Sequence, residues 1–320
     1  MKKEFILAAV VLAAIGVVII GVAFIAFGFD FSNLDTAKYE TNTYTLSEVF
    51  ETIAIESNEA DITFKPSEDE RVQVDCVEWE KVRHEVSVEN GNLKIIAVDN
   101  REWYDHLTLF SFKEQSVTVY LPSEYYAALT ITSSTGDVSV PDHFSFGEVQ
   151  ITTNTGDVSF DTSSDGGLKI STSTGNIGIS GVRADSIDLS VSTGRINGKN
   201  IDCKKTLSVN VSTGKTVLTD VECRALLSNG STGSFTLKNV IAADDFNIER
   251  NTGDVHFENC DAGRITVKTS TGDVTGTLRS KKVFIAKTST GNINVPDTIS
   301  GGRCEITTST GDIAIDINKE

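Results

Sequence analysis

The chain has 320 residues, with 45 Asp and Glu against 28 Lys and Arg, so its formal net charge at pH 7 is −17. So acidic a chain disfavours nucleic acid as a partner, because it offers few cations to neutralise phosphates. The like charge suppresses self-association in solution and suits a body exposed outside a cell. The length would hold two ordinary domains, but an internal repeat described below argues for one elongated body.

Residues 1–4 carry two lysines and precede an uncharged apolar run over residues 5–29. As a helix this run would extend about 37 Å, enough to cross a bilayer with some tilt. It is longer than the apolar core of a signal peptide, and it lacks a good cleavage site. The sequence therefore predicts an uncleaved transmembrane helix over 5–29, with 1–4 in the cytoplasm and the remainder outside the membrane.

Two segments separate this helix from the repeats. Residues 30–48 are polar with scattered aromatics and predict a short stalk. Residues 49–128 have strand patterns without a regular repeat. Within them Ala60 lies between two alternating apolar runs, Asn90-Gly91 predicts a tight hairpin turn, and Pro122 ends a further strand. Because the terminal coils of a solenoid must cover an open sheet edge, we predict that 49–128 form an N-terminal cap of degenerate coils.

Residues 129–320 contain ten copies of the tripeptide [Ser/Asn]-Thr-Gly, spaced by 19 or 20 residues. Apolar residues alternate with polar ones on both sides of each copy, which indicates two short strands joined at the glycine. Glycine at every corner indicates a positive φ, which other residues adopt poorly. An even period over more than half of the chain is typical of a solenoid. The corner glycines are Gly136, Gly156, Gly175, Gly194, Gly214, Gly233, Gly253, Gly272, Gly291 and Gly311.

These patterns together predict an all-β fold, a parallel β-solenoid (β-helix) of about ten coils of 19–20 residues. The atypical β-rich cap and one transmembrane helix precede it. Stacked at ~4.8 Å per coil, ten coils make a rod of roughly 48 Å. The chain ends almost directly after the tenth corner, so we expect the C-terminal coil to be an exposed edge, available for edge-to-edge self-association.

The residue after each corner glycine forms a column that is rich in Asp and Asn. Five carboxylates along one ridge suggest calcium, which takes hard oxygen ligands. Hydrogen bonds from these side chains to the turn backbone explain the column without a metal, and two basic residues interrupt it, so we predict no metal. The column is Asp137, Asp157, Asn176, Arg195, Lys215, Ser234, Asp254, Asp273, Asn292 and Asp312.

Two surfaces are candidates for ligand binding. The corner threonines would form a flat ladder of hydroxyls that matches a repeating ligand, although mutual hydrogen bonding within the stack explains them equally well; the first five are Thr135, Thr155, Thr174, Thr193 and Thr213. The second surface is the densest aromatic patch, which includes Trp103 and Tyr104. Such a patch stacks on sugars or peptides, or packs within the cap.

Nothing in the sequence indicates catalysis or a cofactor. The five cysteines show no zinc-binding spacing, and the four histidines fall at unrelated offsets from the corners. Cys203 and Cys223 both lie nine residues after a corner glycine, so they should stack one coil apart. Two thiols in a core column fit that position better than a disulfide. We therefore expect a protein that is not an enzyme.

The chain resembles the bacterial β-strand-repeat "putative adhesin" family, a domain of unknown function common in Firmicutes. The resemblance rests on the reiterated Ser-Thr-Gly-Asp-Val/Ile rungs, as at 134–138, 270–274 and 309–313, and on the lead-in at 50–62. It covers roughly residues 45–318. It implies a surface-exposed β-solenoid, sometimes tethered to a membrane, with adhesion proposed and some relatives linked to envelope-stress signalling. The family supplies no catalytic residues.

We therefore expect a membrane-anchored extracytoplasmic surface protein of the cell envelope that acts as an adhesin or interaction module. A cell-wall, glycan or protein ligand would be its partner. An envelope-stress sensor is the alternative hypothesis. A carbohydrate-active enzyme is a weaker hypothesis, because the coils carry no inserted loops to build a substrate groove.

Overall fold

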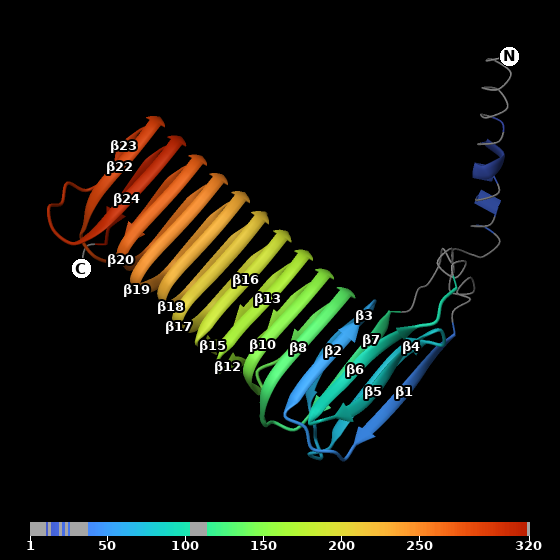
Figure 1. Cartoon of the computed structure of the whole chain (residues 1–320). Helices are drawn as coiled ribbons and strands as arrows, with labels where there is room; N and C mark the ends of the chain where they lie inside the picture. The colour runs from blue at the N-terminus through green and yellow to red at the C-terminus, as the bar shows by residue number, and fades with distance from the viewer. Residues whose placement is uncertain are drawn as a thin grey trace.

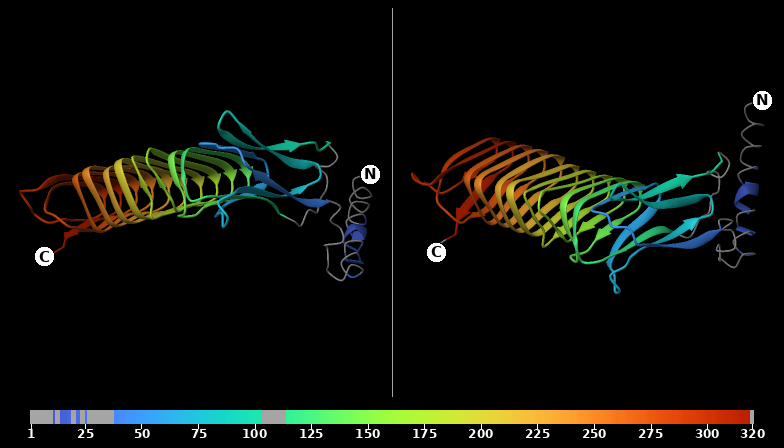
Figure 2. Two further views of the ribbon diagram at one scale, coloured as in Figure 1. Left: turned by 90° about the horizontal axis from the view of Figure 1, so that it is seen from below. Right: turned by 60° about the horizontal axis from the view of Figure 1, so that its bottom comes forward.

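The structure, a computed structural model, describes residues 38–102 and 114–318, together with short helical pieces at 11, 14–18, 21–22 and 25. Over the two long ranges the chain is all-β (Figure 1). The parallel strands stack side by side into a long rod, and antiparallel strands gather at one end of it (Figure 2). The prediction of an all-β parallel solenoid is confirmed.

The predicted transmembrane helix over 5–29 lies mostly outside the described residues. Among the residues that are described, no helix is both long and apolar enough to span a bilayer.

The stacked strands form the body of the rod. They are β8 (Tyr125–Thr135), β9 (Val138–Val140), β10 (Ser145–Thr155), β11 (Val158–Phe160), β12 (Ser163–Ser164), β13 (Gly167–Thr174), β14 (Ile177–Ser180), β15 (Arg183–Ala184), β16 (Ser186–Thr193), β17 (Ile196–Thr213), β18 (Thr216–Thr232), β19 (Phe235–Thr252), β20 (Val255–Thr271), β21 (Val274–Leu278), β22 (Lys282–Thr290), β23 (Ile293–Asn294), β24 (Gly302–Thr310) and β25 (Ile313–Ile317).

Each coil turns at its corner glycine, as the repeat predicts. The corner glycines have φ between +124° and +149°, a region that L-residues rarely enter. Space also requires glycine, because a Cβ at Gly214 would lie 1.6 Å from the carbonyl oxygen of Gly194 in the preceding coil. Each of these ten glycine corners therefore depends on the absence of a side chain both for its backbone conformation and for the close stacking of coils.

A second corner has no glycine in the middle coils. Asn200, Asp220, Asn239 and Asn259 adopt φ of 52° to 57° there, a left-handed conformation that Asn and Asp tolerate better than most residues. Their side chains also form a ladder, since the Asn239 amide donates to Asp220 at 2.7 Å and the Asn259 amide donates to Asn239 at 2.8 Å. Hydrogen bonds between coils thus support a bend that the glycine repeat does not mark.

Apolar side chains fill the interior of the rod in columns. Ile170, Leu189 and Val209 are completely buried at the same place in successive coils, and the coils pair in parallel register. The alternation of apolar and polar residues therefore sends β-branched and leucine side chains inward along every coil.

The N-terminal end of the rod, here called the closed end, is covered by antiparallel strands. Two further coils extend the stack: one from β2 and β3, where Ala60 takes the corner position, and one from β6 and β7. Next, β5 pairs antiparallel with β6, β4 pairs antiparallel with β7, and β1 with β4. These strands are β1 (Tyr39–Leu46), β2 (Thr52–Ser57), β3 (Ala60–Pro66), β4 (Val72–Trp79), β5 (Val82–Glu89), β6 (Asn92–Asp99) and β7 (Gln115–Leu121).

The closed end combines two parallel coils with antiparallel strands, and its first strand lies within residues 30–48. The predicted Asn90-Gly91 turn is present, with positive φ at both residues, between β5 and β6. However, Tyr39–Leu46, within the segment expected to be a stalk, forms β1. Its polar composition hides a strand because Tyr44 and Leu46 are its only apolar residues that pack against the core, while Thr41, Thr43 and Thr45 are exposed.

The far end of the rod, here called the open end, corrects the expectation about the C-terminal coil. The last strands in the sequence, β24 and β25, pair with β20 and β21 on one side and with β22 and β23 on the other. Figure 1 shows β24 lying between β20 and β22. The C-terminal coil is therefore enclosed, and the coil of β22 and β23 is the outermost one.

The side chains explain this exchange of order. Cys304, Ile306, Ile313 and Ile315 of the C-terminal coil are at most 1% exposed, so this coil gains from neighbours on both sides. In the outermost coil, Ile293 is the register partner of Ile313 and is 46% exposed. The coil with the more complete apolar interior thus occupies the inner position.

Candidate functional site

The corner threonines form the ladder that the sequence predicts. They are register partners from one coil to the next, about 4.8 Å apart, and all are exposed. The order follows the stack rather than the sequence at its end: Thr135, Thr155, Thr174, Thr193, Thr213, Thr232, Thr252, Thr271, Thr310 and Thr290. The residue before each threonine, a Ser or Asn, is also exposed. Two adjacent rows of short polar side chains therefore run along the rod.

The threonine hydroxyls are available to solvent or a ligand. Over 38–102 and 114–318, no hydrogen bond joins the hydroxyl of a corner threonine to another protein group. The backbone beneath them is held from inside, since Thr153 and Thr172 donate their hydroxyls to the carbonyls of Thr155 and Thr174 at 3.3 Å. Hydrogen bonds between the corner threonines do not explain the ladder, because the hydroxyls of the buried threonines two positions earlier stabilise the backbone there instead.

A shallow polar hollow lies beside this ladder. It has a volume of about 430 Å³ and crosses several coils on the same face. Its lining includes Ser212, Ser231 and Ser270 from the row next to the threonines, together with Glu249 and Lys268. The hollow gives the otherwise flat surface one concave place with charges of both signs.

The Asp and Asn column after the glycines supports the backbone. The Oδ1 atom of Asp137 accepts a hydrogen bond from the backbone N–H of Asp157 at 2.7 Å, and that of Asp157 accepts from the N–H of Asn176 at 2.7 Å. The same hydrogen bond recurs further along the column, where the backbone N–H of Asp273 donates to the Asp254 carboxylate at 2.9 Å. Each carboxylate therefore pairs a corner N–H of the next coil, which explains the column without calcium.

The two aromatic candidates, Trp103 and Tyr104, lie outside the described residues. The prediction for Cys203 and Cys223 is confirmed, because they are register partners in neighbouring coils and both are free, buried thiols. Burial raises the pKa of Cys223 to about 12, and the neighbouring Cys203 contributes to this shift. Both thiols therefore stay protonated at neutral pH as parts of the core.

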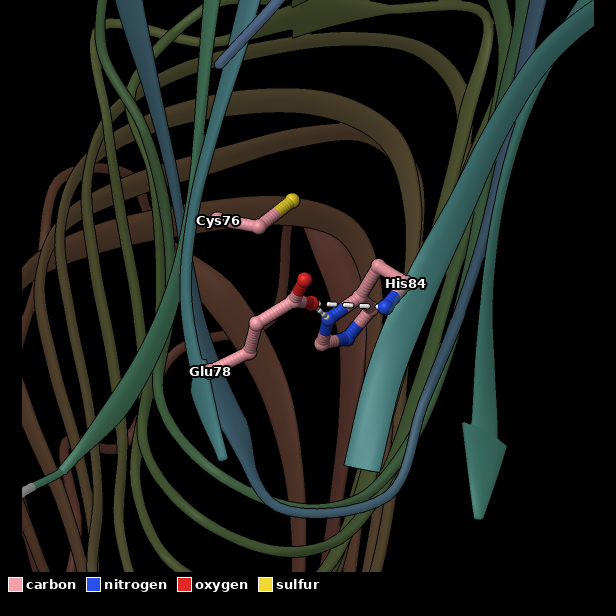
Figure 3. A group of neighbouring side chains, drawn as sticks. All are labelled: Cys76, Glu78 and His84. Atoms are coloured by element: carbon pink, nitrogen blue, oxygen red, sulfur yellow. Dashed lines mark hydrogen bonds and ion pairs between the residues drawn. The ribbon is translucent and has the colours of Figure 1, made fainter. Parts of the chain in front are cut away.

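At the closed end, three buried side chains from two strands converge: Cys76 and Glu78 of β4 and His84 of β5 (Figure 3). Their exposed fractions are 0%, 0% and 2%. One potential ligand atom from each lies within 4.8 Å of the other two. Cys76 and Glu78 are two residues apart in one strand and share its inner face, and His84 faces them from the strand that follows.

Glu78 occupies the gap where β4 and β5 separate. The two strands pair only at Trp79 and Val82. Beyond that point the Glu78 carboxylate replaces the missing backbone hydrogen bonds between them. Its Oε2 accepts from the backbone N–H of His84 at 2.6 Å and lies 2.9 Å from the His84 Nδ1, while Oε1 accepts from the Asn42 amide at 2.6 Å. Both oxygens of the Glu78 carboxylate therefore have hydrogen-bond partners inside the closed end.

The surroundings of this cluster are also polar. The His84 Nε2 lies 3.5 Å from the Ser57 hydroxyl, and the Tyr44 hydroxyl donates to the His84 carbonyl at 3.1 Å. Burial raises the pKa of Cys76 to about 12, and the charges of Glu78 and Asp75 add to the shift. The closed end therefore encloses a thiol, a carboxylate and an imidazole, and hydrogen bonds fix the orientations of the carboxylate and the imidazole.

This cluster was not predicted from the sequence because its three residues have neither a repeat offset nor a zinc-finger spacing. The available signal was a polar residue on the inner face of a strand. Along β4, positions 74, 76 and 78 point inward, so a glutamate at 78 is out of place in an apolar column. A histidine at an inward position of the next strand completes that signal.

The fold and these surfaces define a parallel β-solenoid with a threonine ladder on its surface and one end closed by antiparallel strands. The chain belongs to the Toastrack DUF4097 family, whose model matches residues 50–206 and 198–320. No curated protein matches the chain in sequence.

Several solved structures are similar to the chain at low sequence identity. A "putative lipid binding protein" from Parabacteroides distasonis is 17% identical, with a TM-score of 0.48, over 75% of this chain and 96% of that one. A "putative adhesin" from the same species is 14% identical, also with a TM-score of 0.48, over 86% and 98% of the two chains. A "putative cell adhesion protein" from Clostridium sporogenes is 12% identical, with a TM-score of 0.22, over 88% and 100%.

Proposed function

We propose that this protein is a membrane-anchored, extracytoplasmic surface interaction module, without enzymatic activity, that binds a repetitive ligand such as a cell-wall glycan along its threonine ladder. The apolar run over 5–29 supplies the anchor, and the acidic solenoid extends away from the membrane. The binding surface consists of the corner threonines, the row of Ser and Asn beside them, and the adjoining polar hollow.

The observation that carries this proposal is the regular array of exposed threonine hydroxyls that have no protein partner among the described residues. A polar group that the fold does not use is free to exchange its water for a ligand hydroxyl. Because the hydroxyls repeat once per coil on a rigid scaffold, a ligand with its own linear repeat can contact many of them simultaneously. Each contact is weak, and affinity comes from their number.

The test compares two variants of the full chain that each introduce two lysines into the same pair of coils. One carries Thr155→Lys and Thr193→Lys on the ladder, and the other carries Ser159→Lys and Asn197→Lys on the exposed side of the following strands. Both change the net charge equally. We expect binding to purified peptidoglycan, in a pull-down assay, to fall at least tenfold for the ladder variant alone.

Equal binding by both variants and the wild-type protein would place the contact elsewhere on the rod and end the proposal for the ladder. Circular dichroism of each variant shows that the solenoid is intact. Repeating the assay with cellulose and chitin distinguishes a general preference for linear glycans from a preference for peptidoglycan.

A further inference from the structure

Cys76, Glu78 and His84 are the residue types that bind zinc, and they meet in the buried interior of the closed end. We propose that these three side chains hold one zinc ion, which ties β4 to β5 where the two strands separate. The proposal is independent of the ligand bound along the threonine ladder.

The donor set selects zinc over harder cations. Zinc takes thiolate sulfur, imidazole nitrogen and carboxylate oxygen, usually four ligands in a tetrahedron, whereas calcium and magnesium take oxygen ligands. Here one donor of each kind lies within 4.8 Å of the others. In a tetrahedral site with bonds of about 2.0–2.3 Å the donors lie roughly 3–4 Å apart, so a small contraction brings the three atoms to coordination distance.

Charge balance favours the same conclusion. As zinc ligands, a buried carboxylate and a buried thiolate need a compensating positive charge. The zinc ion carries two positive charges, and the Glu78 carboxylate and the Cys76 thiolate carry one negative charge each. With a neutral His84, the site is neutral as a whole. Binding releases the proton of the thiol, as expected for a cysteine ligand.

The neighbouring residues orient the ligands for this purpose. The Ser57 hydroxyl lies 3.5 Å from Nε2 of His84, and a proton on Nε2 leaves the lone pair on Nδ1, which faces Glu78. The Asn42 amide holds Oε1 of Glu78 at 2.6 Å, so that Oε2 remains on the histidine side. Hydrogen bonds of this kind to the far atoms of metal ligands fix their orientation in known metal sites.

The competing arrangement is an ion pair between a protonated His84 and Glu78, with Cys76 as an ordinary core thiol. In that arrangement the 2.9 Å contact between Nδ1 and Oε2 is a charged hydrogen bond. The two arrangements differ in the cysteine, because only zinc binding makes the thiol a ligand.

The experiment uses the full chain, freed of metal with a chelator and then titrated with Co²⁺ and with Zn²⁺. We expect one equivalent of Co²⁺ to produce thiolate-to-metal charge-transfer absorption, and one equivalent of Zn²⁺ to displace it and to raise Tm. Cys76→Ser should abolish the charge-transfer band. The matched control is Cys304→Ser, which removes an equally buried thiol outside the cluster and should leave the titration unchanged.

A thiol-modification measurement on the wild-type protein covers the case in which a variant does not fold. In mild denaturant, one equivalent of Zn²⁺ should slow alkylation of Cys76 at least tenfold more than alkylation of Cys304, as mapped by mass spectrometry. Absence of the charge-transfer band in wild-type protein, or equal protection of both thiols by Zn²⁺, would establish the ion pair and overturn the zinc site.

Discussion

At the closed end of the solenoid, antiparallel strands cover the last parallel coil, whereas at the open end no described strand pairs with the outer side of β22 and β23. The closed end buries Leu93, Val117 and Val119 completely. At the open end Ile285, Ile293 and Ile299 are 45%, 46% and 95% exposed. The apolar column that is buried at Val117 in the closed end therefore meets water at Ile293 in the open end.

The two ends also differ in how they treat polar groups. At the closed end the strands separate, and buried side chains such as Glu78 take over the backbone hydrogen bonds. At the open end a buried lysine, Lys282, is satisfied by the Ala262 carbonyl at 2.7 Å, the Ser280 hydroxyl at 2.8 Å and the Asp261 carboxylate at 2.5 Å. Polar groups that become buried near either end of the solenoid therefore each need a hydrogen-bond partner inside the protein.

The largest effect is expected from Glu78→Ala at the closed end. It leaves the backbone N–H and ring of His84, and the amide of Asn42, without their common acceptor, and each buried polar group left without a partner costs about 1–3 kcal/mol. Chemical denaturation of the metal-free protein measures this loss. The control is Glu85→Ala on the exposed side of β5, which should leave the midpoint unchanged; equal midpoints for both variants would contradict the prediction.

The next effect tests the exchanged order of the last two coils. Ile306 lies between its register partners Val267 and Ala286, so Ile306→Ala should reduce the free energy of unfolding by about 2–5 kcal/mol. Ile293→Ala in the outermost coil should reduce it by about 1 kcal/mol or less, because half of that side chain already contacts water. If the coils stacked in sequence order, the larger loss would come from Ile293.

A smaller effect concerns pH. Burial raises the pKa of Cys260 to about 11 and that of Cys304 to about 12, from 9.0 in an unfolded chain. The folded state therefore keeps protons that the unfolded chain loses, so this stability is fully present below pH 9 and declines as the pH rises towards 12. Denaturation midpoints across that range measure the decline, and Cys304→Ser should make it shallower. A variant with an unchanged slope would refute the assignment.

The smallest effect is expected at the exposed surface of the open end. Ile285→Lys replaces an outward-facing, 45% exposed side chain and should change the free energy of unfolding by no more than ~0.5 kcal/mol. A lysine on an edge strand opposes pairing with another strand, so any concentration-dependent association of the wild-type protein should weaken. Sedimentation velocity detects that change, and a large loss of stability would mean that the open end is covered.

Much of the fold was predictable because one short motif fixes one coil. Gly156 and Gly175 sit at the same corner with nearly the same φ, 141° and 145°, and the alternation around them assigns the inner face. The threonine ladder follows directly, since in-register stacking of identical coils aligns identical side chains. The bend at Asn200 and Asn239 was missed, because Asn also occurs at many places without a bend.

Interior polar residues were harder to predict, as Arg250 shows. It occupies an inward position that is Thr153 or Thr172 in other coils, and it is only 5% exposed. Its guanidinium donates to the Ser228 hydroxyl at 2.8 Å and lies 4.9 Å from the ring of Phe235, and loss of solvation lowers its pKa to about 10. Gly230 in the preceding coil leaves room for it. Only the stacked coils bring these compensating residues together.

The sequence by itself determined the repeating unit, the strands on both sides of each corner and the face that every side chain takes, because those properties depend on neighbours within about twenty residues. The tertiary structure decided which coil lies next to which at the open end, and it brought Cys76, Glu78 and His84 together at the closed end. Pairing partners of parallel strands are chosen by total burial across the whole stack. No local pattern in the chain carries that information.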